Sequence, residues 1–265
     1  MKRLSLLESH PAIIFFVLTY SFSWLIWMPM VFTNKESRLF IIIGTFGPTS
    51  VAILLTGLKS GRNGLKELLS HFFIWRLNFF WYLFSFFSTM LVVMASIGIH
   101  LIMGGKVPKF NDPRQIYLVI PVFAYVLFLS VLGEEIGWRG YILPRLEQKH
   151  SALFASLIIG LLWGLWHLPE FWMKSNFHHQ IPFILFLLQD IALSIVLTWL
   201  YNSTKKSLLI VNLFHAASNT TLGVLPILPM DTGGDLRPLW IAVSLLWVIA
   251  AIIVMTNKPA WIAHR

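Results

Sequence analysis

Eight apolar blocks of about 20 residues occupy most of this chain, and they limit its possible folds more than any other feature. The blocks cover residues 12–32, 39–58, 79–103, 117–138, 152–170, 181–201, 207–227 and 238–256. A helix of this length crosses the roughly 30 Å hydrocarbon core of a bilayer, and helices satisfy their own backbone hydrogen bonds there. The sequence therefore predicts an all-α, polytopic integral membrane protein with about eight transmembrane helices.

The composition supports this fold class and excludes several others. Hydrophobic residues make up 57% of the 265 positions and charged residues 12%, which is about half the charged share of a soluble domain. The net charge of +9 comes from short basic clusters between the apolar blocks, a pattern that indicates membrane topology rather than nucleic-acid binding. Because the chain has no cysteine, disulfides, thiolate zinc sites and cysteine nucleophiles are excluded.

The basic residues predict that both termini lie in the cytoplasm. With this orientation, 13 Lys and Arg residues fall on the cytoplasmic side and 7 on the opposite side, as the positive-inside rule favours. The first apolar block is too long for a signal peptide, and no small-residue cleavage site follows it. We therefore expect an uncleaved first helix and a location in the plasma membrane.

No internal repeat or linker divides the chain, so we expect a single membrane domain over residues 1–265. Between the second and third blocks, apolar residues from Lys59 to Asn78 recur near helical period, which predicts an interfacial helix on the cytoplasmic surface. An ordinary solvated loop is the alternative there. Gly47 and Pro48 are expected to kink the second helix.

Glu134 and Glu135 lie side by side inside the apolar fourth block. A charge at this depth costs about 2.5–3.5 kcal/mol and is by default a functional hypothesis. If the fourth and fifth helices turn near residues 149–151, Glu134 and His167 lie about 16 and 17 residues from the turn and share one depth. This geometry requires the fourth helix to continue past Arg139 to Leu146, with a kink at Pro144.

The spacing within each helix is also informative. Glu135 and Arg139 are four residues apart and can form an ion pair, which leaves Glu134 free to exchange protons. Gly160 and Gly164 share a face with His167 and permit close approach of another helix. Trp163 supplies an apolar wall, and the seventh block carries a polar stripe at three positions, Asn212, His215 and Asn219.

Three motifs carry a resemblance to a known family: Glu134-Glu135-x-x-x-Arg139, Trp163-x-x-x-His167 and His215-x-x-x-Asn219. Their order on separate helices, within residues 117–222, resembles the CAAX protease and bacteriocin-processing family of intramembrane endopeptidases, in which the aromatic position is more often Phe. The family core is accordingly expected over residues 117–222.

This resemblance implies a mechanism and a substrate. Glu134 would activate a water molecule with help from His167, while His215 and Asn219 stabilise the oxyanion and Arg139 holds Glu135. Burial makes a carboxylate a stronger base, which suits general-base catalysis. The expected partners are the bilayer and a membrane-associated protein or peptide, such as a lipidated one, cleaved from the cytoplasmic side.

A zinc-dependent version of the same protease is the main alternative mechanism. His167, His215 and either Glu134 or Glu135 could supply the ligand set of a hydrolytic zinc site. The chain has no His-Glu-x-x-His motif, and Arg139 beside Glu135 would compete with a cation. We therefore expect no cofactor.

The same residues allow other functions. A non-catalytic, bacteriocin-immunity-type binding protein could keep the fold without turnover, and a proton-coupled transporter could use Glu134, Glu135 and Asp190 as a relay.

Taken singly, the motif residues could also have purely structural roles. The glutamates could reach the interface, and His167, His215 or Asn219 could be interhelical hydrogen-bond partners. We expect Asp190 to lie outside the site, and a loop of Glu170, His178 and His179 to be solvated.

Overall fold

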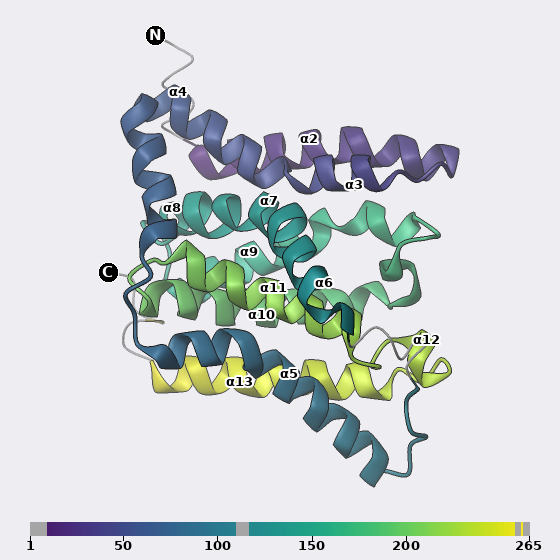
Figure 1. Ribbon diagram of the computed structural model, residues 1–265. Coiled ribbons are helices and arrows are strands. Elements are labelled where there is room, and N and C mark those ends of the chain that lie inside the picture. Colours follow the sequence, from purple (N-terminus) through teal and green to yellow (C-terminus); the bar gives the residue numbers. More distant parts are fainter. Residues whose placement is uncertain (1–9, 110–116, 258–260, 262–265) are drawn as a thin grey trace.

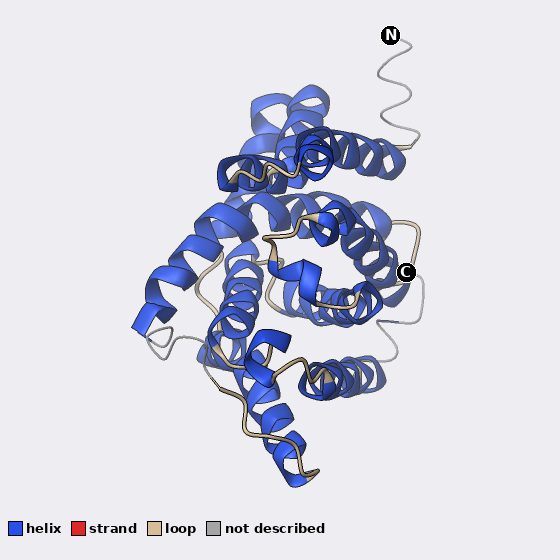
Figure 2. Ribbon diagram, turned by 90° about the vertical axis from the view of Figure 1, so that its right-hand side faces the viewer, coloured by secondary structure: helices blue, strands red, loops and turns tan. Residues whose placement is uncertain are grey.

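The computed structural model describes residues 10–109, 117–257 and 261. Within these ranges it contains helices, turns and loops and no strand (Figure 2). Eight of the described helical segments are long and apolar enough to cross a membrane, which confirms the predicted fold class. These segments are Pro11–Thr33, Arg38–Phe73, Phe79–Ile102, Val119–Leu146, Ala152–Trp172, Phe183–Ser203, Leu208–Thr232 and Arg237–Thr256.

The long helices lie roughly side by side in layers (Figure 1). One outer layer consists of α2 (Pro11–Thr33), α3 (Arg38–Thr45) and α4 (Gly47–Ser70), and the opposite one of α5 (Phe79–Ile102) and α13 (Arg237–Thr256). Between them lie α9 (Ala152–Trp166), α10 (Phe183–Ser203) and α11 (Leu208–Val224). The central position of α9, α10 and α11 places His167 and His215 away from the lipid-facing surface.

The second span is broken twice. Phe46 separates α3 from α4, so the expected kink falls immediately before Gly47 and Pro48. Gly61 has φ +58°, a left-handed backbone angle that glycine adopts at little cost. After Gly61 the chain stays helical and runs across the ends of the other helices toward η1 (His71–Phe73) and α5 (Figure 1). A helix rather than a loop is thus confirmed here, while its place at the membrane surface stays a prediction.

The fourth span continues past Arg139 to Leu146, as its expected geometry required. It contains α6 (Val119–Val126), the π-helix η3 (Leu127–Val131), α7 (Leu132–Glu135), the π-helix η4 (Ile136–Ile142) and α8 (Leu143–Leu146). Pro144 lies in the first turn of α8, where it leaves no backbone donor unsatisfied. The two glutamates therefore occupy a short α-helical stretch between two π-helical turns, an irregularity that is frequent at functional sites.

Glycines let neighbouring helices approach the motif residues closely. A Cβ atom on Gly137 would lie 2.6 Å from the backbone oxygen of Pro48, so the start of α4 packs directly on η4. On α9, a Cβ atom on Gly160 would lie 2.6 Å from the Cα of Ile191 on α10, and one on Gly164 equally near the Leu187 side chain. The close approach predicted for Gly160 and Gly164 is confirmed, with α10 as the partner helix.

Candidate active site

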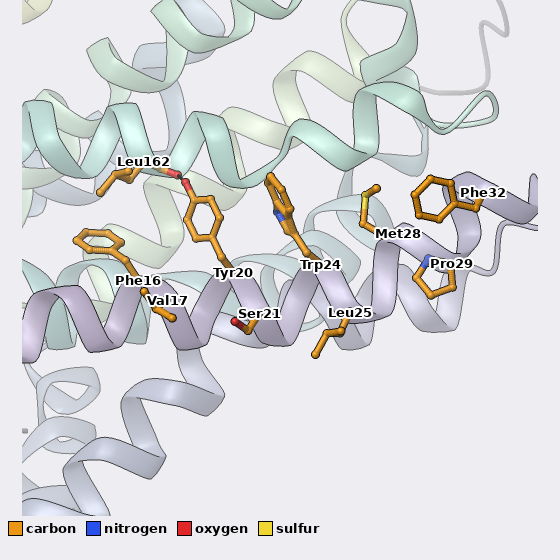
Figure 3. Close-up of a pocket in the computed structure, with 10 residues that line it drawn as sticks. All are labelled: Phe16, Val17, Tyr20, Ser21, Trp24, Leu25, Met28, Pro29, Phe32 and Leu162. Carbon is orange, nitrogen blue, oxygen red and sulfur yellow. Dashed lines mark hydrogen bonds between the residues drawn. The ribbon is translucent and has the colours of Figure 1, made fainter. Parts of the chain in front are cut away.

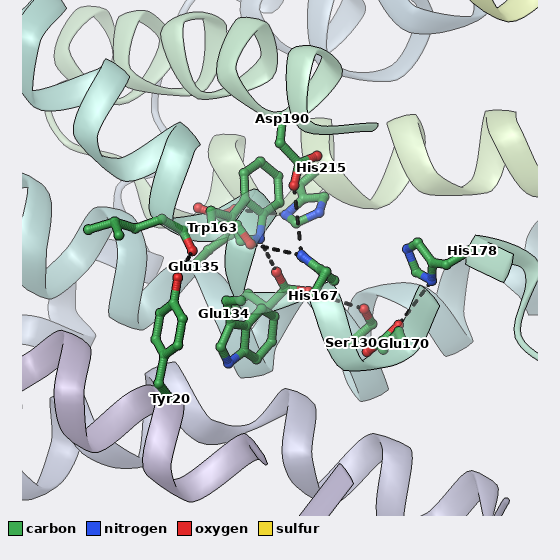
Figure 4. Close-up of polar contacts among 12 residues, drawn as sticks. Tyr20, Ser130, Glu134, Glu135, Trp163, His167, Glu170, His178, Asp190 and His215 are labelled. Atoms are coloured by element: carbon green, nitrogen blue, oxygen red, sulfur yellow. Dashed lines mark hydrogen bonds and ion pairs between the residues drawn. The ribbon is translucent and has the colours of Figure 1, made fainter. Parts of the chain in front are cut away.

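The three motifs meet in one buried site (Figure 4). Glu134 and Glu135 come from α7, Arg139 from η4, His167 from the end of α9 and His215 from α11. All five residues are buried, and direct contacts join α7 to α9 and to α11. The expectation that these helices bring their polar groups to one depth is therefore confirmed.

One carboxylate oxygen of Glu135, Oε1, contacts both Arg139 and His215. Arg139 Nη1 donates to Glu135 Oε1 at 2.9 Å, which is the ion pair expected from the four-residue spacing. The Nδ1 of His215 lies 2.7 Å from the same Oε1. The guanidinium of Arg139 also lies over the Trp163 ring, 4.9 Å from its centroid, a favourable arrangement for a buried cation. Together these contacts fix Glu135.

Glu134 has neutral partners instead. Its Oε2 accepts a 2.6 Å hydrogen bond from the indole N–H of Trp163, and its Oε1 accepts a longer one, 3.4 Å, from Ser130. Trp163 links Glu134 to His167. Its indole binds Glu134 and its backbone carbonyl binds His167.

His167 lies at the end of α9 with a defined tautomer. Its Nδ1 is 3.0 Å from the carbonyl oxygen of Trp163, and a carbonyl can only accept, so Nδ1 carries the proton. The Nε2 of His167 is then a free acceptor, which fits a role beside a general base. Asp190 on α10 lies 3.7 Å from the same Nδ1, so this acid, which is expected to lie outside the site, is next to His167.

The polar stripe of α11 divides into three different roles. His215 binds Glu135, a contact that the sequence did not indicate. Asn212 donates to the Leu208 carbonyl within its own helix, at 2.7 Å. Asn219 is half-buried, and its side chain makes no hydrogen bond with the described residues. Its amide is therefore available to a substrate.

The segment after α9 corrects the expectation of a solvated loop. Glu170 and His178 are 6% and 5% exposed and lie 3.0 Å apart, and the His178 ring centroid is 5.6 Å from that of His167. The short helices η5 (Leu168–Trp172) and η6 (Phe177–Gln180) fold this segment back over the end of α9. His179 is exposed, as expected. Pro169, which cannot continue an α-helix, was the available signal for this turn.

The zinc alternative does not fit the side chains as they are placed. No group of three His, Asp or Glu residues is arranged to hold a metal ion within the described ranges. Glu135 Oε1 is shared by Arg139 and His215, and Glu134 Oε2 is bound by the Trp163 indole. A zinc ion at Glu135 would also have to compete with the charge of Arg139.

An apolar groove of about 780 Å³ lies along α2, from Phe16 to Phe32, against Leu162 of α9 (Figure 3). None of the six candidate site residues lines it. Several α2 side chains along it are exposed, among them Leu25 and Phe32, as is usual for a surface covered by lipid. The groove therefore belongs to the outer surface of the bundle and not to the site.

Comparison with known proteins agrees with the three motifs. The family model for the type II CAAX prenyl endopeptidase Rce1-like family matches residues 116–221, which include α7, α9 and most of α11. The CAAX prenyl protease 2 of Methanococcus maripaludis is 25% identical over 262 residues, covering 92% of this chain and 93% of that protein. The similarity thus extends from the motif region to nearly the full length. The resemblance found in the motifs is confirmed: the chain is similar to the Rce1-like CAAX prenyl endopeptidases, which supports an intramembrane protease.

Proposed function

We propose that this protein hydrolyses a peptide bond of a prenylated, membrane-associated protein with a water molecule activated by Glu134. The observation that supports this most is the contrast between two buried carboxyls, of which Glu135 is bound to Arg139 and His215. Glu134 meets only the neutral donors of Trp163 and Ser130. A carboxylate oxygen that no cation binds is open to accept a proton from water.

In the proposed first step, Glu134 takes a proton from water, and the oxygen of the water forms a bond to the carbonyl carbon of the substrate. The free Nε2 of His167 accepts a hydrogen bond from the same water and orients it. The carbonyl oxygen becomes an oxyanion. In the second step the carbon–nitrogen bond breaks, and Glu134 returns its proton to the leaving amine.

His215 and Asn219 are proposed to stabilise the oxyanion. The Asn219 amide has two N–H donors, and its side chain makes no hydrogen bond with the described residues. His215 directs Nδ1 to Glu135, so when both ring nitrogens are protonated, Nε2–H can donate to the substrate. Glu135 accepts from Nδ1 of that ring, and Arg139 holds Glu135 in place. Donors fixed in advance at a developing charge are a large source of rate enhancement.

The proposed substrate class rests on the comparisons. The relative from Methanococcus maripaludis is named as a CAAX prenyl protease, and we propose a prenylated C-terminal peptide for this chain as well. Such a peptide would reach the site from the cytoplasmic face of the plasma membrane, with both termini of the protein on that side. An apolar lipid anchor holds its peptide at the membrane, where the site is buried between helices.

The direct test uses the purified full-length protein and a fluorogenic peptide with and without a farnesyl group. We expect Glu134→Gln to lower kcat by about 10²–10⁴, the usual contribution of a general base. Glu147→Gln is the matched control, because Glu147 lies just after the end of the fourth span and accepts a hydrogen bond from Asn202. Cleavage by Glu134→Gln at the wild-type rate would contradict the proposed function.

Metal dependence is tested separately. We propose a metal-free reaction, so activity is expected to survive extended chelator treatment, and elemental analysis of the active protein should find no stoichiometric zinc. One bound zinc ion per chain, with loss of activity on chelation and recovery with zinc, would contradict the metal-free mechanism while leaving the protease assignment intact.

A further inference from the structure

Trp163 contacts four of the six candidate site residues. Its indole N–H donates to Glu134 at 2.6 Å, and its carbonyl accepts from His167 at 3.0 Å. Arg139 lies over its ring, and the His215 ring meets it edge-on at 5.1 Å. We propose that Trp163 is a positioning residue whose indole N–H fixes one oxygen of Glu134 and leaves the other to accept the proton from water. This inference rests on the proposed function, in which Glu134 is the base.

The two oxygens of Glu134 are held unequally. The 2.6 Å contact from Trp163 to Oε2 is short for an N–H donor, whereas the 3.4 Å contact from Ser130 to Oε1 is long for a hydroxyl donor. An indole nitrogen donates and never accepts, so Trp163 cannot take the proton itself. Oε1, with the weaker partner, is the oxygen available to water.

The direction of the indole N–H is itself fixed. The Arg139 guanidinium lies over the ring, and the His215 ring makes a T-shaped contact with it. The helix that carries it is pressed against α10 at Gly160 and Gly164, where a Cβ atom would clash with neighbouring atoms. α9 therefore cannot rotate freely, and the hydrogen bond to Glu134 is preorganised.

Other buried tryptophans show that this hydrogen bond is not a general result of burial. Trp138 and Trp166 are both fully buried, and the indole nitrogen of each has no hydrogen-bond partner among the described residues. Trp138 lies on η4, packed in an aromatic cluster with Phe15. Replacing Trp138 by Phe removes an unbound N–H, which makes Trp138→Phe a matched control for Trp163→Phe.

The first test measures kcat and KM of the full-length variants on the farnesylated peptide. Trp163→Phe keeps an aromatic ring and removes only the donor, so kcat should fall roughly tenfold to hundredfold, the loss expected for a hydrogen bond to a charged group. KM should change by less than about threefold, and Trp138→Phe should keep kcat within about threefold of wild type. Equal kcat values for Trp163→Phe and Trp138→Phe would overturn the inference.

The second test does not depend on activity. Among the indole N–H resonances of the 12 tryptophans, the signal of Trp163 is the one missing from Trp163→Phe. Its proton resonance should move upfield in Glu134→Leu, because the short bond to the carboxylate is lost. An unchanged resonance would overturn the inference, whereas an active Glu134→Gln variant would instead overturn the proposed function.

Discussion

Glu134 and Glu135 are neighbours in the chain, yet they lie in two differently built halves of the site. The Glu135 half contains an arginine and a histidine on one carboxylate oxygen. The Glu134 half contains an indole, a hydroxyl and no cation bonded to the carboxylate. Both carboxyls are buried to a similar extent. The partners of a buried acid, and not its burial, therefore distinguish a structural group from a reactive one.

Helix geometry explains how adjacent residues reach such different surroundings. Successive side chains on a helix of 3.6 residues per turn point about 100° apart. Glu135 is therefore directed toward His215 on α11, and Glu134 toward Trp163 on α9. Arg139 lies one turn beyond Glu135 and on the same face. One short helix thus supplies both halves of the site.

The largest effect on stability is expected from breaking the Glu135 half. Arg139→Leu leaves a buried carboxylate without its cation, which should lower the free energy of unfolding by about 3–5 kcal/mol. The double variant Arg139→Leu with Glu135→Leu removes both charges and should recover part of this loss. Thermal unfolding in detergent measures both variants. A single variant as stable as wild type would mean that the pair does not hold this half together.

A large effect on rate is expected from His167. His167→Ala removes the proposed water-orienting nitrogen, and kcat should fall about hundredfold. The unfolding midpoint should fall less than in Arg139→Leu, because the His167 side chain makes a single hydrogen bond with the described residues, to the Trp163 carbonyl. Peptide cleavage and thermal unfolding are measured on the same sample. Full activity of His167→Ala would remove this residue from the reactive half.

A smaller effect is expected from the segment that covers His167. Glu170→Gln weakens the 3.0 Å contact with His178, and the loss should be about 1.5–3 kcal/mol, typical of hydrogen bonds to charged groups. Hydrogen exchange should show faster opening of residues 168–180 with little change elsewhere. Unchanged exchange in this segment would show that the Glu170–His178 contact does not hold it over the site.

The smallest effect is expected from Asp190→Asn. Oδ2 of Asp190 lies 3.7 Å from His167 and has no hydrogen-bond partner among the described residues. Asparagine has nearly the same shape, so kcat should stay within about threefold of wild type. A loss of kcat as large as that of His167→Ala would place Asp190 in the reactive half as a partner of His167.

Local spacing predicted a substantial part of this site. The four-residue interval between Glu135 and Arg139 fixed their ion pair, because helix geometry alone brings such residues together. Rise per residue placed Glu134 and His167 at one depth, and Gly160 with Gly164 marked the close contact with another helix. These relations depend on positions within one helix or one hairpin.

The remaining contacts depend on how the helices are rotated about their axes, which spacing does not determine. The same spacing on α11 would allow the His215 ring to be directed only toward the substrate. The helix is instead rotated so that Nδ1 meets Glu135. The sequence indicates only an apolar wall for Trp163, because its indole N–H meets Glu134 only once α7 and α9 are packed together. Glu170 and His178 come into contact only because the chain folds back after Pro169.

The central claim is that the two glutamates have different functions, and one side-by-side measurement tests it most directly. Turnover and thermal unfolding are measured for Glu134→Gln and Glu135→Gln in the same detergent. We predict that Glu134→Gln loses about 10²–10⁴ in kcat and keeps its stability, whereas Glu135→Gln loses about 3 kcal/mol or more of stability because Arg139 and His215 lose their anion. Wild-type turnover by Glu134→Gln, or the same loss of stability in both variants, would contradict the account.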